Sequence, residues 1–284
     1  MRNALDRARD RARISRSRVV FPESDSPRVA EAMARLQAEG LARPMPVGAQ
    51  TDAQLAALLT ARPMKEALAR RMLARPLIRA AAMVAAGEAD VLVAGAENPT
   101  KKVIEAAALA IGPVKGINTA SSFFLMVLPD GRALVFADCA LNVEPDAQAL
   151  ADIARASQKS AKALLGRVEV ALLSYATGTS GVGASVAKVR QAAEISGFSG
   201  PVQADAALNA AIASTKGAGT GKANVLIFPN LDAGNIAYKL LQELAGARAY
   251  GPVLQGFAHP VCDLSRGASA DDIVNATLLT IALA

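Results

Sequence analysis

A hydroxyl, a guanidinium and two carboxylates lie within one short polar stretch near the carboxyl end of the chain, DLSRGASADDIV at 263–274. An arginine can hold two oxygens of an anion in one fork, and a nearby carboxylate can act as a base. Ser269 and Asp272 also fit a helix capping box, S-x-x-D before an apolar run. Capping does not account for Ser265 or Arg266, which lie too far upstream. The stretch therefore indicates an anion site beside a base.

A second candidate is the loop SYATGTSGVGASV at 174–186, in which glycines and hydroxyl residues separate an expected buried strand from an expected helix. Backbone N–H groups of such a loop, with the helix N-terminus, would bind an anion such as phosphate. The loop lacks the lysine of a P-loop and the glycine spacing of a dinucleotide site, which disfavours ATP and NAD. A flexible loop with a helix cap is the alternative interpretation.

A third stretch, PNLDAGNIAYK at 229–239, follows the apolar run ANVLIF. We expect a turn at 232–234, with Asn235 capping the next helix and Lys239 about one turn into it. This stretch alone does not specify a ligand.

The elements that must position these loops alternate between apolar runs and helical stretches along almost the whole chain. The 284 residues are 52% hydrophobic but only 4% aromatic, a composition that favours helices packed on a buried sheet. ADVLVAGA, VEVALLSYA and ANVLIFP are expected to be buried strands, and Pro129-Asp130-Gly131 predicts a hairpin. This order predicts an α/β fold with a largely parallel sheet, where ligands gather beyond the carboxyl ends of the strands.

Composition excludes several function classes. Cys139 and Cys262 lie far apart and His259 is the only histidine, so we expect no metal site, no disulfide framework and a reducing cytoplasm. The net charge of +6 comes largely from the helix-like stretch 2–18, where acidic residues are interspersed, so nucleic acid is not expected as a partner. Asp6 and Asp10 argue against a transit peptide, and no apolar run is long enough for a membrane span.

Several blocks together resemble the phosphate acetyl/butyryltransferase family, and within it the members that transfer acetyl groups. The blocks are VVFPESDSPRVAEA, ADVLVAGAENPT, VFADCALNVEPDAQALADIA, VALLSYATGTSG, GKANVLIFPNLDAGNIAYKL and YGPVLQGFAHPVCDLSRGASADDIV, in family order. The resemblance implies reversible transfer of an acetyl group between acetyl phosphate and coenzyme A, with inorganic phosphate as the other product. It implies coenzyme A as a substrate, no tightly bound cofactor and no metal in the chemical step.

The resemblance also implies roles for single residues. Asp272 matches the base that takes the thiol proton, Arg266 the arginine that neutralises charge on the carbonyl and phosphate oxygens, and Ser265 the serine that hydrogen-bonds the same intermediate. The glycine-rich loop matches the phosphate side. The substrate-binding residues expected on this basis are Ser174, Thr177, Thr179, Ser180, Gly181, Asn235 and Lys239.

The fold that the resemblance implies is an α/β/α sandwich of the isocitrate/isopropylmalate dehydrogenase type, in two domains with the active site in the cleft between them. The first domain would hold 1–114 plus 254–284 and the second 115–253. The resemblance further implies a homodimer.

The chain departs from the family pattern where members commonly carry T-L-R-P, because Glu105 stands at the position of the arginine. Lys101 or Lys102 could substitute for it. An R-K-H-K-G segment expected earlier is also unrecognisable. Two alternatives therefore stay open beside acetyl transfer: propionyl or butyryl transfer, and a non-catalytic domain that senses acetyl-CoA. An NAD-linked dehydrogenase lacks the dinucleotide glycine spacing.

Overall fold

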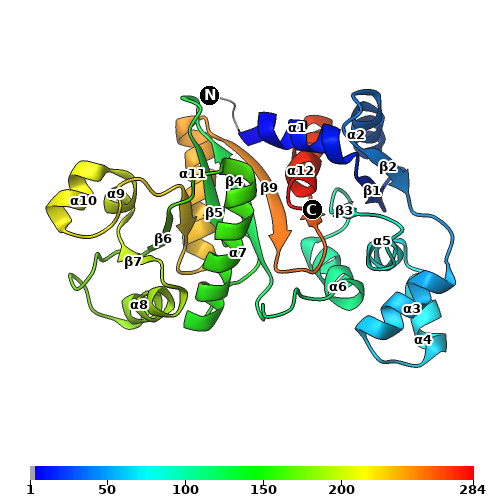
Figure 1. The fold of residues 1–284 in the computed structure, drawn as a ribbon, viewed down its shortest axis with the longest axis horizontal. Helices are drawn as coiled ribbons and strands as arrows, with labels where there is room; N and C mark the ends of the chain where they lie inside the picture. The colour runs from blue at the N-terminus through cyan, green and yellow to red at the C-terminus, as the bar shows by residue number, and fades with distance from the viewer. Residues whose placement is uncertain (1–3) are drawn as a thin grey trace. The chain divides into compact units, whose positions relative to one another are not determined.

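The computed structural model describes residues 4–284, which form two compact units. One unit combines the chain up to Gly116 with Gly251–Ala284, and the other is Ile117–Tyr250. Each unit contains β-strands with helices on both faces of them (Figure 1), so the predicted α/β class is confirmed. No helix among the described residues is both long and apolar enough to cross a membrane.

The strands of the first unit run parallel except for the last one in their order. The order is β2-β1-β3-β10-β9, and the strands are β1 (Arg18–Phe21), β2 (Arg43–Pro46), β3 (Val91–Ala94), β10 (Val261–Asp263) and the end of β9 (Arg248–Gln255). All four residues of β3 are buried, as predicted for ADVLVAGA. β3 and β10 run parallel with Asp263 opposite Ala94, so the loops that follow them leave the sheet at the same edge.

Helices cover both faces of this sheet. α1 (Ala4–Ser15), α2 (Pro27–Ala38) and α12 (Ala270–Ile281) pack on one face, above the strands in Figure 1. The helices below the strands are α3 (Asp52–Ala61), α4 (Glu66–Leu73), α5 (Pro76–Ala85) and α6 (Thr100–Ala110). α1 is amphipathic as predicted, because Ala4, Ala8 and Ala12 are buried at a spacing of one helical turn. Residues 2 and 3 of the predicted stretch lie outside the described residues.

The strands of the second unit include the predicted hairpin. β4 (Ser121–Val127) and β5 (Ala133–Ala137) pair antiparallel across the Pro-Asp-Gly turn, with Phe124 opposite Phe136. The full order is β4-β5-β8-β6-β7, where β6 is Val170–Leu173, β7 is Ser199–Val202 and β8 is Val225–Ile227. β5, β8, β6 and β7 run parallel, so the loops after β5, β8 and β6 share one edge.

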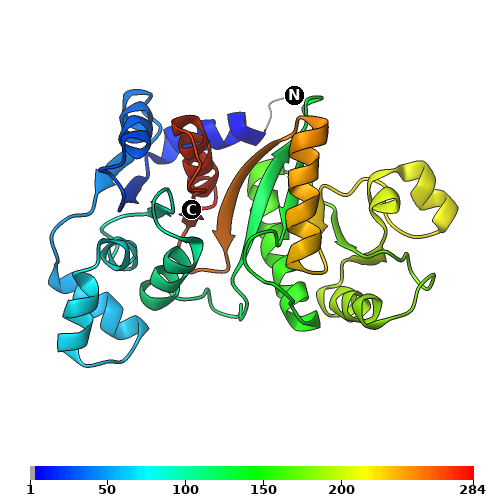
Figure 2. The ribbon, with the colours of Figure 1, turned by 180° about the vertical axis from the view of Figure 1, so that it is seen from behind.

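Two long helices lie on opposite faces of the strands of the second unit. α7 (Ala147–Leu165) lies in front of it in Figure 1, and α11 (Leu231–Ala245) lies in front of it in the reverse view of Figure 2. α8 (Ala184–Ser196) packs beside α7, and the short helices α9 (Ala204–Leu208) and α10 (Ala210–Lys216) follow β7. α11 attaches to the core through Tyr238, whose ring stacks on Phe124 with centroids 4.3 Å apart.

Candidate functional site

The polar segment near the carboxyl end joins β10 to α12, and its capping box is confirmed. The Ser269 hydroxyl accepts a hydrogen bond from the Asp272 amide at 3.2 Å, and Asp272 Oδ2 accepts one from the Ser269 amide at 3.0 Å. The Ser269 hydroxyl also lies 2.7 Å from the same Oδ2. These bonds engage a single oxygen, and Asp272 Oδ1 has no hydrogen-bond partner within residues 4–284. The cap therefore leaves one carboxylate oxygen for chemistry.

Ser265 and Arg266 are exposed on the loop between these two elements, while Leu264 and Ala268 on either side of them are buried. The Ser265 hydroxyl accepts a hydrogen bond from the Gly267 amide at 3.3 Å. Two buried anchors thus hold a short loop whose polar side chains reach outward. The structure places the three residues predicted to be catalytic on one continuous segment of the first unit.

A buried carboxylate organises the neighbouring loop at 95–98 and was missed by sequence reasoning. Glu23, which follows β1, is only 8% exposed. Its oxygens accept hydrogen bonds from the amides of Ala96, Glu97 and Asn98 at 2.8, 3.1 and 2.8 Å, and from the Asn98 side chain at 2.7 Å. An acidic residue directly after a buried strand, in FPESD, was the available signal.

A second buried carboxylate, Asp263 at the end of β10, has no such partners. Its side chain is 1% exposed and neither oxygen has a hydrogen-bond partner among the described residues. Burial raises the pKa of Asp263 to about 6, and the nearby Glu23 carboxylate adds to the rise. The Thr100 hydroxyl is near enough to oppose the rise in part, but it does not reach hydrogen-bond geometry with either oxygen. A Cβ on Gly95 would lie 2.5 Å from Asp263 Oδ1, so only glycine permits this close approach of the two loops.

The glycine-rich loop after β6 divides its predicted residues into two groups. Thr177 is 7% exposed, accepts a hydrogen bond from the Gln203 amide at 3.0 Å and donates one to Gln203 Oε1 at 3.2 Å. Ser174 accepts a bond from the Ala176 amide at 3.3 Å. These two hydroxyls hold the loop in place together with the Ser180 hydroxyl, which accepts a hydrogen bond from the Thr177 amide at 3.0 Å. Thr179 and Ser180 are nevertheless exposed, and Gly181 is partly exposed.

Two expectations for the start of α11 were wrong. Asn230, not Asn235, caps the helix by accepting a hydrogen bond from the Ala233 amide at 3.0 Å. The predicted turn at 232–234 is the first helical turn, and a Cβ on Gly234 would meet the Asp138 carbonyl at 2.5 Å. That close contact with the end of β5, rather than a turn, requires the glycine.

Asn235 is accordingly not the cap of α11, and Lys239 lies further along the helix than expected. The Asn235 amide donates to the Cys139 carbonyl at 3.1 Å, which ties α11 to the chain after β5. Lys239 lies about two turns into α11, with its ammonium 5.1 Å from the centre of the Tyr238 ring. Contacts among the described residues connect neither side chain to the loop at 174–183.

Lys188 is a further residue of this edge that the sequence did not reveal. It lies on α8, donates to the Pro229 carbonyl at 2.8 Å and forms an ion pair with Glu144. It therefore links the helix after the glycine-rich loop to the chain that leads into α11. A lysine just over a turn into that helix was the only available signal.

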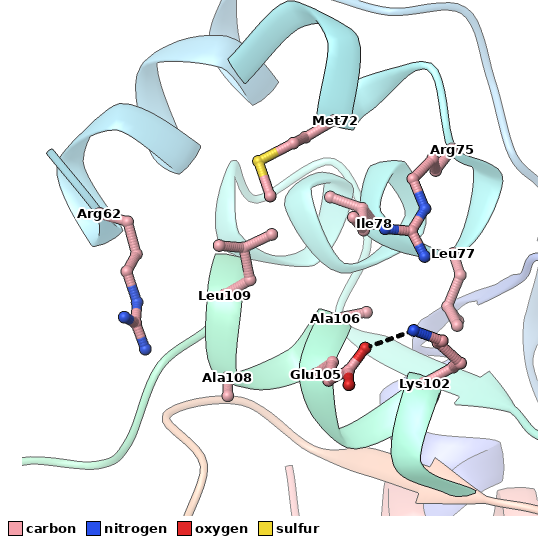
Figure 3. A pocket seen from close by; sticks show the side chains of 10 residues that line it. All are labelled: Arg62, Met72, Arg75, Leu77, Ile78, Lys102, Glu105, Ala106, Ala108 and Leu109. Atoms are coloured by element: carbon pink, nitrogen blue, oxygen red, sulfur yellow. Dashed lines mark hydrogen bonds and ion pairs between the residues drawn. The ribbon is translucent and has the colours of Figure 1, made fainter. Parts of the chain in front are cut away.

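A cavity of 360 Å³ lies within the first unit, between α3, α4, α5 and α6 (Figure 3). Its apolar lining is Met72, Leu77, Ile78, Ala106, Ala108 and Leu109, and its charged lining is Arg62, Arg75, Lys102 and Glu105. Lys102 donates to Glu105 Oε2 at 2.9 Å, which lowers the pKa of Glu105. Lys102 is thus paired with Glu105, the carboxylate at the position where the resemblance led us to expect an arginine.

Neither cysteine is available as a nucleophile. Cys139 and Cys262 are both free and buried, and burial raises the pKa of both thiols, that of Cys262 to about 12. Residues 4–284 contain no group of three His, Cys, Asp or Glu side chains arranged to hold a metal ion.

Comparison with known proteins identifies relatives over nearly the whole chain. The model of the family described as phosphate acetyl/butaryl transferase matches residues 49–281. Phosphate acetyltransferases of Acetivibrio thermocellus and Paracoccus denitrificans are 36% and 38% identical, covering 97% of this chain and 96% and 98% of those proteins. The crystal structure of a phosphotransacetylase from Streptococcus pyogenes is 33% identical, with a TM-score of 0.92 over 98% of this chain and 97% of that one.

The unpartnered carboxylate of Asp263 predicts a pH-dependent stability. Its folded-state pKa lies above the unfolded value, so the charged form destabilises the fold above about pH 6, and the penalty disappears as the pH falls toward 4. Asp263→Asn should raise the free energy of unfolding at pH 8 by on the order of 2 kcal/mol, and the difference from wild type should shrink toward pH 4. Urea unfolding at both pH values measures it.

The matched control is Asp52→Asn, because the Asp52 side chain is 96% exposed. Asp52 makes a surface pair with Arg70 at 3.7 Å, so its stability difference from wild type should change by less than about 1 kcal/mol between the two pH values. An equally small change for Asp263→Asn would show that burial of this carboxylate does not penalise the fold.

Proposed function

Because the chain belongs to the phosphate acetyl/butyryl transferase family and is an acyltransferase, we propose that it transfers an acetyl group reversibly between acetyl phosphate and coenzyme A. The observation that carries this proposal is the segment in which Ser265, Arg266 and one free oxygen of Asp272 are presented from a loop with buried ends. Relatives named for this reaction align with almost the entire chain.

In the proposed reaction the thiol sulfur attacks the carbonyl carbon of acetyl phosphate. A thiol has a pKa of about 8.5, so at neutral pH its proton must leave as the bond to carbon forms, and Asp272 Oδ1 is the acceptor. The carbon–oxygen bond to phosphate then breaks, and inorganic phosphate departs with the electron pair. Arg266 binds the carbonyl and phosphate oxygens in one fork, and the Ser265 hydroxyl donates to the same oxygens.

No acyl-cysteine intermediate enters this proposal, because the buried thiols of Cys139 and Cys262 stay protonated at neutral pH. Their free state also supports the reducing cytoplasm that we propose as the protein's location. The exposed hydroxyls of Thr179 and Ser180 and the backbone of Gly181 are proposed to bind the phosphate group. Ser174 and Thr177 hold that loop in shape.

The cavity beside α6 is proposed to bind the anionic part of coenzyme A. Arg62, Arg75 and Lys102 supply positive charge around an apolar lining (Figure 3), a combination suited to a molecule with phosphates and an organic body. Glu105 opposes such a ligand, because its carboxylate engages Lys102 at 2.9 Å.

The exposed face of α11 supports the proposed homodimer. Ile236, Leu240 and Leu244 are spaced by one helical turn and are 56%, 52% and 81% exposed, whereas the buried residue of this helix is Gly234. If two copies of α11 pack antiparallel about a twofold axis near Leu240, Lys239 of each copy lies near Glu243 of the other. The stripe would form the centre of an interface, since stable interfaces bury about 1,200–2,000 Å².

The reaction and its base are tested together in the enzyme assay. Wild-type protein should form acetyl-CoA from acetyl phosphate and coenzyme A, and Asp272→Asn should lower kcat by about 100-fold or more. The side-chain oxygen of an asparagine can still accept the hydrogen bond from the Ser269 amide in the capping box, but an asparagine cannot take the thiol proton. Thioester formation followed by absorbance gives kcat, and thermal unfolding checks the fold.

Asp271→Asn is the matched control, because Asp271 is adjacent on α12 and pairs with Arg35 at 2.6 Å. It should keep wild-type kcat, and an Asp272→Asn enzyme of equal rate would exclude the base role. Coenzyme A binding without turnover in wild type would favour the sensing domain. Faster turnover with propionyl or butyryl phosphate would favour the longer acyl groups.

The cavity proposal predicts that Glu105→Gln improves coenzyme A binding. Removing the carboxylate frees Lys102 for an anionic ligand, so KM for coenzyme A should fall on the order of threefold while KM for acetyl phosphate stays unchanged. Glu66→Gln, which removes a similar surface pair with Arg70 at 2.8 Å, should change neither constant. Equal KM values in wild type and Glu105→Gln would place coenzyme A elsewhere.

The homodimer proposal predicts that Leu240→Glu yields monomers, because the twofold arrangement would bring two carboxylates together. Light scattering after size-exclusion chromatography measures the molar mass. Leu68→Glu, at a leucine 41% exposed on α4, should stay dimeric. A Leu240→Glu protein that remains a dimer would show that this stripe is not the interface.

A further inference from the structure

Arg28, in the first turn of α2, contacts both of the loops that follow β3 and β10. Its Nη1 donates to the carbonyl oxygens of Arg266 and Ala268, each at 2.8 Å. Its Nη2 donates to the Ala96 carbonyl at 3.2 Å and to Glu97 Oε1 at 3.0 Å. One guanidinium therefore connects the loop that carries Ser265 and Arg266 to the loop at 95–98.

The neighbouring residues hold Arg28 in this position. Pro27 starts α2 and Ser26 is its N-cap residue, so the Arg28 backbone is set by a helix start. The Ser26 hydroxyl donates to Glu97 Oε1 at 2.8 Å, the same oxygen that accepts from Arg28. Ser26 and Arg28 thus both donate hydrogen bonds to the same carboxylate oxygen of Glu97.

The two carbonyls that accept from Nη1 belong to the residues on either side of Gly267. Glycine has the greatest backbone freedom of any residue, so this loop would sample several conformations unless its carbonyls were held. The loop's own bonds, Gly267 amide to Ser265 hydroxyl at 3.3 Å and Ala268 amide to Ser265 carbonyl at 2.9 Å, fix its amides. Arg28 fixes the carbonyl side of the Arg266–Gly267 peptide group and, beyond it, the Ala268 carbonyl.

We propose that Arg28 is a positioning residue for acyl transfer: it fixes the backbone from which the Arg266 side chain extends, so that the Arg266 guanidinium meets the reacting oxygens in one orientation. Arg28 acts through Arg266 and is assigned no contact with substrate. This inference rests on the proposed function, because it assumes that Arg266 binds the transition state.

The geometry calls for arginine rather than lysine. The planar guanidinium directs N–H groups along fixed directions, and here they reach three backbone carbonyls and one carboxylate at the same time. A lysine ammonium could keep the attraction to Glu97 but could not reach all four acceptors from one point. Arg28→Lys therefore separates the loss of the hydrogen bonds from the loss of the charge.

Steady-state kinetics of Arg28→Ala and Arg28→Lys test the inference. Both variants should lose about 10- to 100-fold in kcat, as expected when a catalytic group is displaced by about 1 Å, with KM for both substrates changed less than about threefold. Arg70→Ala, which removes a surface pair with Glu66 on α4, is the matched control and should keep wild-type kcat. Thermal unfolding of each variant reports whether it is folded. If Arg28→Ala does not fold, the kinetics of Arg28→Lys alone test the inference.

A double-mutant comparison distinguishes positioning from a general structural role. In an Arg266→Ala background, Arg28→Ala should lower kcat much less than it does in wild type, because the group that it positions is absent. Equal losses in both backgrounds, or wild-type kcat in folded Arg28→Lys, would overturn the inference. Failure of the wild-type enzyme to form acetyl-CoA would instead overturn the proposed function, so the two failures are distinguishable.

Discussion

The parallel pairing of β3 with β10 determines where the charged segment lies. The Leu264 amide donates to the Ala94 carbonyl at 2.6 Å, and the register sets Asp263 opposite Ala94. Since the strands are parallel and adjacent, the loops that follow them start side by side, and Gly95 lets them touch. Two loops this close need shared partners for their backbone polar groups. Glu23, which follows β1, accepts from the amides, and Arg28, in the first turn of α2, donates to the carbonyls.

The two buried carboxylates at this edge show what those shared partners do. Glu23 has exchanged water for three backbone amides and the Asn98 side chain, so its charge orders the loop at 95–98. Asp263 has lost water without such an exchange, and the cost appears as its raised pKa.

The sequence predicted those features that depend on residues close together in the chain. The Ser269–Asp272 capping box and the Pro-Asp-Gly hairpin involve neighbours, and both are confirmed. The predicted start of α11 was wrong because Asn230 and Asn235 both fit an N-cap locally. The helix begins at Leu231, and Gly234 in its first turns lies close to the carbonyl of Asp138, a residue distant in the chain. The role of Arg28 was invisible for the same reason, since its partner Arg266 lies 238 residues away.

The departure at Glu105 changes the charge of the cavity beside α6 without removing its capacity for anions. Glu105 neutralises Lys102, but Arg62 and Arg75 line the same space and form no ion pair with any residue in 4–284. Three cations and one carboxylate leave the cavity with a net charge of +2. Each unpaired guanidinium can hold a phosphate with two hydrogen bonds. The arginines on the neighbouring helices thus outweigh Glu105, so in the proposed coenzyme A site this carboxylate should lower the affinity for the ligand without preventing its binding.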